Sequence, residues 1–295
     1  MIGIDWGTSA FRAYRLAPGG AILDRRESEG GILSVPKGGF PAALSAAIGP
    51  WLAEGESLVL LCGMVGSRQG WVEVPYLPCP AGPAEIAAAL TPLPFEGARC
   101  LLVPGLTTRD AAGVPDVMRG EETKLIGLLA ELGEAEALAC LPGTHAKWAR
   151  LGGGKVTGFA TQMTGEVRAV LLDHSILGRL AQPDAPMDEA AFLRGVGRAR
   201  QGGGLLHHLF GTRGLGLMGE LSEAATASYL SGLLIGHEVA AALAEGMPPG
   251  PVHLAGSATL TRAYALAFGA FGLEHRLHDP DLALRGLALI AETLQ

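Results

Sequence analysis

Two short apolar segments at the start of the chain flank a turn of small and hydroxylated residues. The first segment, residues 2–4, runs into Asp5, and a strand-like pattern resumes at residues 11–16. Between them lies a turn made of Gly7, Thr8 and Ser9. This pattern predicts that the fold opens with a β-hairpin that has a tight, glycine-led connection.

The same stretch has chemical potential. A buried strand would bring the carboxylate of Asp5 to its own end, beside backbone N–H groups and two hydroxyls that the turn exposes. Backbone amides arranged in this way hold phosphate oxygens, and a carboxylate holds a hydrated divalent cation. An ordinary hairpin that happens to contain Asp and Gly explains the residues equally well, so the rest of the chain has to decide.

Length and composition indicate a globular chain with more than one core. With 295 residues, two domains are expected. Hydrophobic residues make up 48% of the chain and charged residues 17%, which excludes an intrinsically disordered protein. A net charge of -7 without a basic stripe argues against a nucleic-acid partner. If so acidic a chain binds anions, it must gather its few Lys and Arg residues locally.

Cysteine usage and hydropathy predict a reducing, aqueous compartment. The cysteines are far apart and form no C-x-x-C pair, which argues against a disulfide framework or a zinc site. The chain begins without a charged-then-apolar leader, and its most apolar long segment, residues 230–243, carries His237 and Glu238. We therefore predict a cytoplasmic protein with no membrane partner.

Alternating helix and strand patterns predict an α/β fold. Apolar residues at helical spacing predict helices over residues 40–51, 85–90, 120–132, 165–177, 188–201, 221–245, 260–268 and 281–294. Short apolar runs predict strands over residues 21–27, 57–62, 99–103, 136–141, 148–151, 155–160, 251–254 and 273–277. Two segments are expected to be loops: the glycine-punctuated residues 63–71, and the segment that runs from Pro104 and Gly105 to residue 118.

The pattern restarts near residues 133–136, where a strand again leads into a Gly-Thr turn. We therefore predict two domains of similar architecture, over residues 1–134 and 135–295. The cleft between them would be the natural ligand site. The last helix has a second option, which is to pack back on the first domain.

Two later turns resemble the first in residue type. Gly143 and Thr144 follow a predicted strand, and Gly256 and Ser257 lie between a strand and a helix. Two facing Gly-Thr turns could grip a polyphosphate from both sides, and small residues let a flat ligand approach the backbone closely. Close strand–helix packing is the alternative explanation for Gly256. No Walker loop or well-placed G-x-G-x-x-G is present, so P-loop and Rossmann folds lose support.

In this order the three turns resemble the two phosphate motifs and the adenosine motif of the actin, Hsp70 and sugar-kinase superfamily. Within that superfamily, several strings together resemble the 2-dehydro-3-deoxygalactonokinase family: I-D-W-G-T-S, G-M-V-G-S-x-x-G-W, V-P-G-L, V-M-R-G-E-E-T-K-L-I-G, L-P-G-T-H-A-K-W, Q-M-T-G-E and L-S-G-L-L-I-G-H-E-V. The resemblance implies two actin-like (ribonuclease H-like) domains with an ATP cleft between them. It also implies transfer of the ATP γ-phosphoryl group to the terminal hydroxyl of 2-dehydro-3-deoxy-D-galactonate, in D-galactonate breakdown.

The resemblance implies roles for the turn residues. Asp5 would hold Mg²⁺ through water. Phosphates would meet Gly7, Thr8, Ser9, Gly143, Thr144 and Lys147, and adenosine would lie against Gly256 and Ser257. The second phosphate turn of the superfamily often starts with Asp, whereas Leu141 and Pro142 precede the turn here, which argues against a second metal-linked carboxylate.

The acid–base residue is expected at the start of the helix predicted over residues 120–132. Sugar kinases of this superfamily commonly place an Asp at a helix N-terminus in a G-D-Q string, and Gly120-Glu121-Glu122 occupies the corresponding place. Glu121 is therefore the candidate base, since free backbone N–H groups and the helix dipole favour its ionised form. Asp116 and Glu166 are the alternatives. Glu121 and Glu122 would also suit the first turn of any helix, without a catalytic role.

The implied substrate is itself an acid, so a cation should meet its carboxylate. Arg119 and Arg68 are the candidates, because Arg can engage a carboxylate through two parallel hydrogen bonds. Further candidates for the sugar pocket are Gly66, Trp71, Gln162, Thr164 and Glu166. Trp71 suits a core position equally well, and His145, beside the second turn, is interpreted as a packing or capping residue.

Two other functions remain open on this sequence. The first is a kinase for a different keto-deoxy or aldonic acid, because one fold hosts several chemistries. The second is an actin- or Hsp70-like ATPase switch, although the chain has no additional peptide-binding domain or filament-forming insertion. The predicted partners are ATP and a small sugar acid, and a homodimer is an option.

Overall fold

The computed structural model describes residues 1–279 and 281–294 and divides the chain into two compact units. The first unit contains Met1–Glu136, Ala149–Ala160 and the C-terminal segment from Asp279; the second contains Ala137–Trp148 and Thr161–His278. A single boundary at residue 134 is therefore too simple. The reason is that two later segments pack with the first unit: a hairpin bonded at Ala81 and Glu134, and the last helix.

The main sheet of the first unit has six strands in the order β3-β2-β1-β4-β7-β6. Strand β1 pairs antiparallel with β2 and parallel with β4, which in turn is parallel to β7. The predicted opening hairpin is therefore confirmed. The strands are β1 (Ile2–Trp6), β2 (Phe11–Leu16), β3 (Ile22–Ser28), β4 (Leu58–Cys62), β6 (Thr91–Pro92) and β7 (Arg99–Leu102).

A second sheet of the first unit has the order β5-β8-β9, with strands β5 (Leu77–Pro78), β8 (Leu106–Arg109) and β9 (Pro115–Met118). The prediction of a loop up to residue 118 was wrong, because this segment is an antiparallel hairpin. Its strands are short and rich in polar residues, so no apolar run marks them. The turn between them is closed by Asp110, whose carboxylate accepts hydrogen bonds from the Ala112 and Val114 N–H groups.

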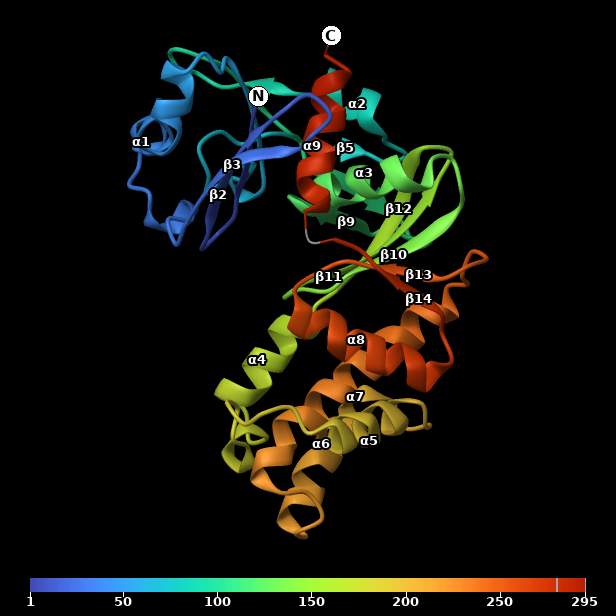
Figure 1. Ribbon diagram of the computed structural model, residues 1–295. Coiled ribbons are helices and arrows are strands. Elements are labelled where there is room, and N and C mark those ends of the chain that lie inside the picture. The colour runs from blue at the N-terminus through green and yellow to red at the C-terminus, as the bar shows by residue number, and fades with distance from the viewer. Residues whose placement is uncertain (280, 295) are drawn as a thin grey trace. The chain divides into compact units, whose positions relative to one another are not determined.

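Helices α1 (Phe40–Ala53), α2 (Pro83–Ala88), α3 (Glu121–Leu132) and α9 (Leu282–Glu292) complete the first unit. Helix α9 lies beside α3 in Figure 1, and the two are in close contact. Glycines make this approach possible: a Cβ on Gly127 would lie 2.0 Å from the Leu282 carbonyl oxygen, and one on Gly286 would lie 1.9 Å from the Thr123 carbonyl oxygen. Backbone thus meets backbone behind the start of α3.

The second unit is built on a five-stranded sheet in the order β12-β11-β10-β13-β14, in which β10, β13 and β14 are parallel. Its strands are β10 (Ala137–Leu141), β11 (Ala146–Gly152), β12 (Lys155–Gln162), β13 (Val252–Leu254) and β14 (His275–Leu277). Strands β11 and β12 each continue from one unit into the other. The restart of the strand–turn–strand pattern predicted from the sequence is present at β10 and β11.

Five helices complete the second unit: α4 (Thr164–His174), α5 (Glu189–Ala199), α6 (Gly204–Leu217), α7 (Glu223–Ala244) and α8 (Ala258–Phe271). Helices α5, α7 and α8 share an apolar core with the sheet, and α6 packs on α7 (Figure 1). Helix α6 was not predicted, because its four glycines and uneven apolar spacing hide the helical pattern. Short 3₁₀ turns occur at Ile32–Ser34, Met64–Gly66 and Gly178–Leu180.

Helix α7 is the one described helix whose length and composition would suffice to cross a membrane. It begins at Glu223, earlier than the apolar segment noted in the sequence, and 67% of its most apolar window is buried within the structure. Its residues form core contacts with α5, α8 and the sheet. This burial is typical of the central helix of a globular unit.

Candidate functional site

The first glycine-led turn lies where β1 ends. Asp5 pairs in register with Cys62 of β4, and its Oδ2 lies 3.4 Å from Arg12 Nη1. The Gly7 N–H donates to the Ala10 carbonyl across the turn, at 2.9 Å. Thr8 and Ser9 lie within this closed turn, and their side chains are exposed. The hydroxyls are thus available to a ligand beside a partly exposed carboxylate.

The backbone behind this turn is fixed by the segment that begins at Gly31. The Ile32 N–H donates to the Gly7 carbonyl at 3.0 Å, and a Cβ on Gly31 would lie 2.3 Å from the Thr8 carbonyl oxygen. Only glycine can occupy that position without moving the turn. The turn is therefore held from behind, which pre-organises its exposed face for a ligand.

Two further segments of the first unit meet this turn. Gly63 follows β4 with φ +93°, and a Cβ there would lie 3.1 Å from Asp5 Oδ1. Gly120, with φ +106°, precedes α3, and a Cβ there would lie 3.3 Å from Gly63 Cα. The structure thus brings Asp5, the start of the glycine-rich loop and the Arg119–Glu121 segment together, although they are far apart in the sequence.

Two glutamates at the start of α3 have very different environments. Glu121 is half-buried, and its Oε2 accepts a hydrogen bond from the Arg119 N–H at 3.2 Å. Glu122 is completely buried, and its Oε2 accepts from the Gly120 N–H at 2.6 Å, while its Oε1 has no hydrogen-bond partner among the described residues. Burial, helped by the neighbouring Glu121, raises the pKa of Glu122 to about 8. The sequence pattern indicates only an ordinary first-turn residue at Glu122 and gives no sign that this acid is buried.

Arg119 lies inside the first unit, with its side chain only 8% exposed. Its Nη2 donates to the Val74 carbonyl at 2.6 Å, and its guanidinium lies 4.4 Å from the centre of the Tyr76 ring. Its Nε and Nη1 are buried without a hydrogen-bond partner in the described part of the chain. A Cβ on Gly66 would lie 2.9 Å from Nη1, so the structure brings these two predicted residues together. Each unpaired buried donor costs about 1–3 kcal/mol, which an anionic ligand would recover.

The other predicted residues of the first unit are placed differently. Arg68 is 87% exposed and lies 3.6 Å from Glu73. Trp71 stacks on Phe40 with ring centres 6.2 Å apart, so its ring contributes to the core. Asp116 lies on β9, where its Oδ1 accepts a hydrogen bond from the Val117 N–H at 2.7 Å.

In the second unit, the Gly143-Thr144 turn connects β10 and β11 and meets the start of α4. The Glu166 N–H donates to the Thr144 carbonyl at 3.0 Å, and a Cβ on Gly165 would lie 2.5 Å from the Gly143 carbonyl oxygen. His145 Nε2 lies 2.5 Å from Glu166 Oε2, so this predicted packing residue is half-exposed and paired with a carboxylate. Hydrogen bonds and close backbone packing therefore join the turn to the start of α4.

Lys147 and Gln162, both predicted to contact ligands, lie on strands of the second unit's sheet. Lys147 is the second residue of β11, with its side chain 4% exposed. Gln162 is the last residue of β12, just before α4 begins at Thr164. Neither residue lines the cavity described below.

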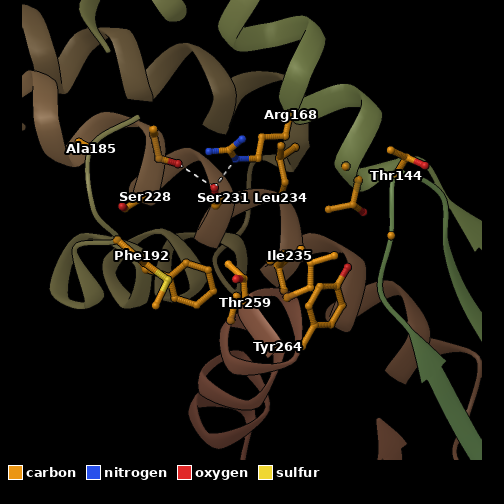
Figure 2. A pocket seen from close by; sticks show the side chains of 17 residues that line it. Thr144, Arg168, Ala185, Phe192, Ser228, Ser231, Leu234, Ile235, Thr259 and Tyr264 are labelled. Carbon is orange, nitrogen blue, oxygen red and sulfur yellow. Dashed lines mark hydrogen bonds between the residues drawn. The ribbon is translucent and has the colours of Figure 1, made fainter. Parts of the chain in front are cut away.

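A cavity of about 430 Å³ opens beside the second turn. Figure 2 shows Thr144 on one side of it and Phe192 on the other, with Thr259 and Tyr264 of α8 between them. Its walls are mainly apolar, with hydroxyls contributed by Thr144, Thr164, Ser228, Ser231, Thr259 and Tyr264. Both the size and the lining are typical of small-molecule sites.

One basic side chain, that of Arg168, reaches this cavity from α4. Its Nε donates to Ser231 Oγ at 2.7 Å, as the dashed line in Figure 2 marks, and burial lowers its pKa. The sequence does not single out Arg168, because its partner Ser231 lies 63 residues away in the chain.

The third turn also approaches this region. A Cβ on Gly256 would lie 3.5 Å from Pro142, which precedes the second turn. Ser257 is the N-cap of α8, and the cavity wall is formed by the next turn of that helix, at Thr259 and Leu260. The residues predicted for adenosine thus lie just outside the cavity, and residues two to four positions further line it.

No group of three or more His, Cys, Asp or Glu side chains gathers for a metal ion within residues 1–279 and 281–294. Asp5 offers one partly exposed carboxylate next to exposed hydroxyls. This donor set fits a hydrated Mg²⁺ that arrives with a phosphate ligand, because Mg²⁺ keeps several waters and takes one or two carboxylates. It does not fit a closed protein cage.

We expect Glu122→Gln to stabilise the protein at alkaline pH. Between pH 4.5 and about 8 the folded state keeps a proton on Glu122 that the unfolded chain has lost, so stability falls as pH rises through that window. Gln mimics the neutral acid and removes a penalty on the order of 4 kcal/mol at pH 8 or above. Urea unfolding at pH 5, 7 and 9 measures how the free energy of unfolding changes with pH, with exposed Glu134→Gln as the control. If the free energy of unfolding of Glu122→Gln changes with pH as steeply as that of the wild type, the assignment is contradicted.

Comparison with known proteins identifies the family. The family model described as 2-keto-3-deoxy-galactonokinase matches residues 5–290. A 2-dehydro-3-deoxygalactonokinase of Escherichia coli (strain K12) is 36% identical over 294 residues, which cover 99% of this chain and 98% of that protein. A crystal structure from Sinorhizobium meliloti, described as that of a 2-dehydro-3-deoxygalactonokinase protein, is 39% identical, with a TM-score of 0.91 and coverage of 99% of this chain and 97% of that one.

A more distant solved structure shows the fold class. The activator of the 2-hydroxyisocaproyl-CoA dehydratase from Clostridium difficile, solved with bound ADPNP, is 12% identical with a TM-score of 0.55, over 100% of this chain and 95% of that one. The α/β fold is therefore that of the actin-like ATPases and sugar kinases, as the sequence predicted. With a family model that covers nearly its whole length and relatives matched end to end, the chain belongs to the 2-keto-3-deoxy-galactonokinase family.

Proposed function

We propose that this chain is an ATP-dependent kinase that phosphorylates the terminal hydroxyl of 2-keto-3-deoxy-galactonate, also called 2-dehydro-3-deoxygalactonate. The observation that carries the proposal is the match to this kinase family over residues 5–290. The described sites are compatible with it: each unit has a glycine-led turn at a strand end, and the first unit adds a carboxylate at a helix start. The reaction is a step of D-galactonate breakdown in the cytoplasm.

In the proposed mechanism, Glu121 accepts the proton of the substrate's terminal hydroxyl. The hydroxyl oxygen forms a bond to the γ-phosphorus of ATP while the bond from that phosphorus to the β–γ bridging oxygen breaks, and ADP leaves with the electron pair. The transition state is loose, so positioning and charge stabilisation supply most of the acceleration. Mg²⁺, held through water by Asp5, supplies charge neutralisation at the phosphates when bound.

Exposed groups of the two turns bind the nucleotide. Thr8 and Ser9, and on the second unit Gly143 and Thr144, contact phosphates. The cavity next to Thr144 holds adenosine, since its volume and largely apolar walls suit a flat heterocycle and its ribose. Gly256 contributes by letting the third turn approach this region closely.

Arg119 binds the carboxylate of the sugar acid. Its unpaired Nε and Nη1 supply a fork of donors, and Val74 and Tyr76 hold the guanidinium in one orientation. Because these nitrogens are buried, the loop that contains Gly66 must shift to admit the anion. Arg68, on the same loop and exposed, is a second contact for the acid when the loop closes.

We expect ATP consumption to depend on the sugar acid. ADP release is measured with 2-keto-3-deoxy-galactonate, with other keto-deoxy and aldonic acids, and with the corresponding neutral sugars. Turnover should be fastest with the first compound, and Arg119→Lys should raise its KM about tenfold, because Lys keeps the charge and loses the paired geometry. Hydrolysis that is independent of any acceptor would instead favour an ATPase switch, and preference for another acid would reassign the substrate.

A further inference from the structure

A carboxylate, Glu238, lies six residues before the end of the apolar helix α7 and is only 3% exposed. Its neighbours on the helix, Ile235, Val239 and Ala242, belong to the core of the second unit. Burial raises the pKa of Glu238, and its hydrogen bonds act in the opposite direction. Burying a carboxylate is costly, and apolar replacements of buried charges are often at least as stable, so stability alone does not account for an acid here.

Three donors from three different elements converge on this carboxylate. Trp148 Nε1 of β11 donates to Glu238 Oε1 at 2.8 Å. Tyr264 Oη of α8 donates to Oε2 at 2.8 Å, and Thr164 Oγ1, at the start of α4, also donates to Oε2. Both carboxylate oxygens are therefore occupied by protein donors.

Two of these donors belong to the wall of the cavity. Thr164 and Tyr264 both line it, whereas Trp148 does not line it and packs edge-on against Phe268 in the core. Figure 2 shows Tyr264 at the edge of the cavity that is nearest to Ile235 of α7. The Oε2 atom thus ties α4 and α8 together where both face the same space.

Thr164 also links Glu238 to the second turn. It is the first residue of α4, and two residues later the Glu166 N–H donates to the Thr144 carbonyl. Between them, Gly165 packs closely on Gly143: a Cβ on Gly165 would lie 2.5 Å from the Gly143 carbonyl oxygen. A shift of Thr164 would therefore move the turn, because these contacts leave no free space between the two segments.

We propose that Glu238 is a positioning residue for nucleotide binding, which fixes Thr164 and Tyr264 in the cavity wall and, through Thr164, holds the start of α4 against the Gly143-Thr144 turn. The inference rests on the proposed function, which puts adenosine in this cavity. Glu238 itself touches no ligand. Its effect is on the affinity for nucleotide and not on the chemical step.

The test is calorimetric titration of AMP-PNP into the purified full-length protein. Thr164→Val keeps the shape of the side chain and removes the donor, so its Kd should rise about tenfold, whereas Thr164→Ser keeps the hydroxyl and should stay within about twofold of wild type. Glu238→Leu should match Thr164→Val, because it removes both oxygens that accept from the three donors. With sugar acid, KM for ATP should rise in Glu238→Leu, while its kcat at saturating ATP and its KM for the acid stay within about twofold of wild type.

Trp148→Phe is the matched control, since it removes a donor to the same carboxylate that does not line the cavity. It should lower thermal stability and leave the AMP-PNP Kd within about twofold. Equal weakening of AMP-PNP binding by Trp148→Phe and Glu238→Leu would overturn the inference in favour of a purely structural network. Wild-type affinity in Thr164→Val would overturn it even if Glu238→Leu does not fold. Wild-type protein that binds no AMP-PNP would overturn the proposed function as well, so the two failures are distinguishable.

Discussion

Replacing Glu121 with Gln is expected to lower kcat by about 10²–10⁴-fold, the usual contribution of a general base. The amide is nearly isosteric, and its oxygen can still accept the hydrogen bond from the Arg119 N–H that Glu121 Oε2 accepts now. The start of α3 should therefore keep its geometry, and KM for ATP should change little. Steady-state kinetics with varied ATP and varied sugar acid separate these effects.

Two competing carboxylates and one control make this experiment decisive. Asp116→Asn and Glu166→Gln test the alternatives: Asp116 is engaged with the Val117 N–H on β9, and Glu166 lies beside His145 in the second unit. Glu134→Gln, at an exposed position after α3, should leave turnover unchanged. If Glu121→Gln keeps near-normal turnover while one of the alternatives loses it, the base has to be reassigned.

Gly286→Val should destabilise the first unit by about 3 kcal/mol or more. A Cβ at this position would lie 1.9 Å from the Thr123 carbonyl oxygen, so α9 has to move away from α3 or lose its contact. Overpacking usually costs about 1–3 kcal/mol, and the obstacle here is rigid backbone, which puts the cost at the upper end. Urea unfolding measures the change. Because Thr123 is two residues after Glu121, turnover should fall as well.

Gly269→Ala provides the matched control for this packing argument. Gly269 lies inside helix α8, and a Cβ at this position would have open space within 4 Å, so Ala should be neutral or stabilising by about 0.5–1 kcal/mol. If Gly286→Val cost less than about 1 kcal/mol, the close α3–α9 approach would not contribute to stability in solution.

Local secondary structure could be predicted from the sequence because it depends on neighbouring residues. The hairpin around Gly7, the restart at Gly143 and the α/β alternation follow from apolar runs interrupted by glycine, and all three are present. The β8–β9 hairpin and helix α6 were missed. Polar strands and glycine-rich helices take their stability from packing against other elements, and a local pattern does not record that packing.

The buried acids show the limit of reading the sequence alone. Glu122 looks like a good first-turn residue, and Glu238 looks like an interruption of an apolar helix. The signal that could have found Glu238 was the presence of one acid in a long apolar segment, which argues for a partner inside the fold. Its partners Trp148, Thr164 and Tyr264 are 90, 74 and 26 residues away in the chain, so no local window joins them.

By itself, the sequence determined the family, the alternation of strands and helices and the glycine-led turns, because each is written in the order and spacing of residues. Only the tertiary structure decided which groups meet: Asp5 with Gly63 and Gly120 in the first unit, and Thr164 with Glu238 in the second. It also decided which charges are buried, as at Arg119 and Glu122. Burial and proximity arise from packing between distant segments, and they set the pKa values and unpaired donors from which the chemistry follows.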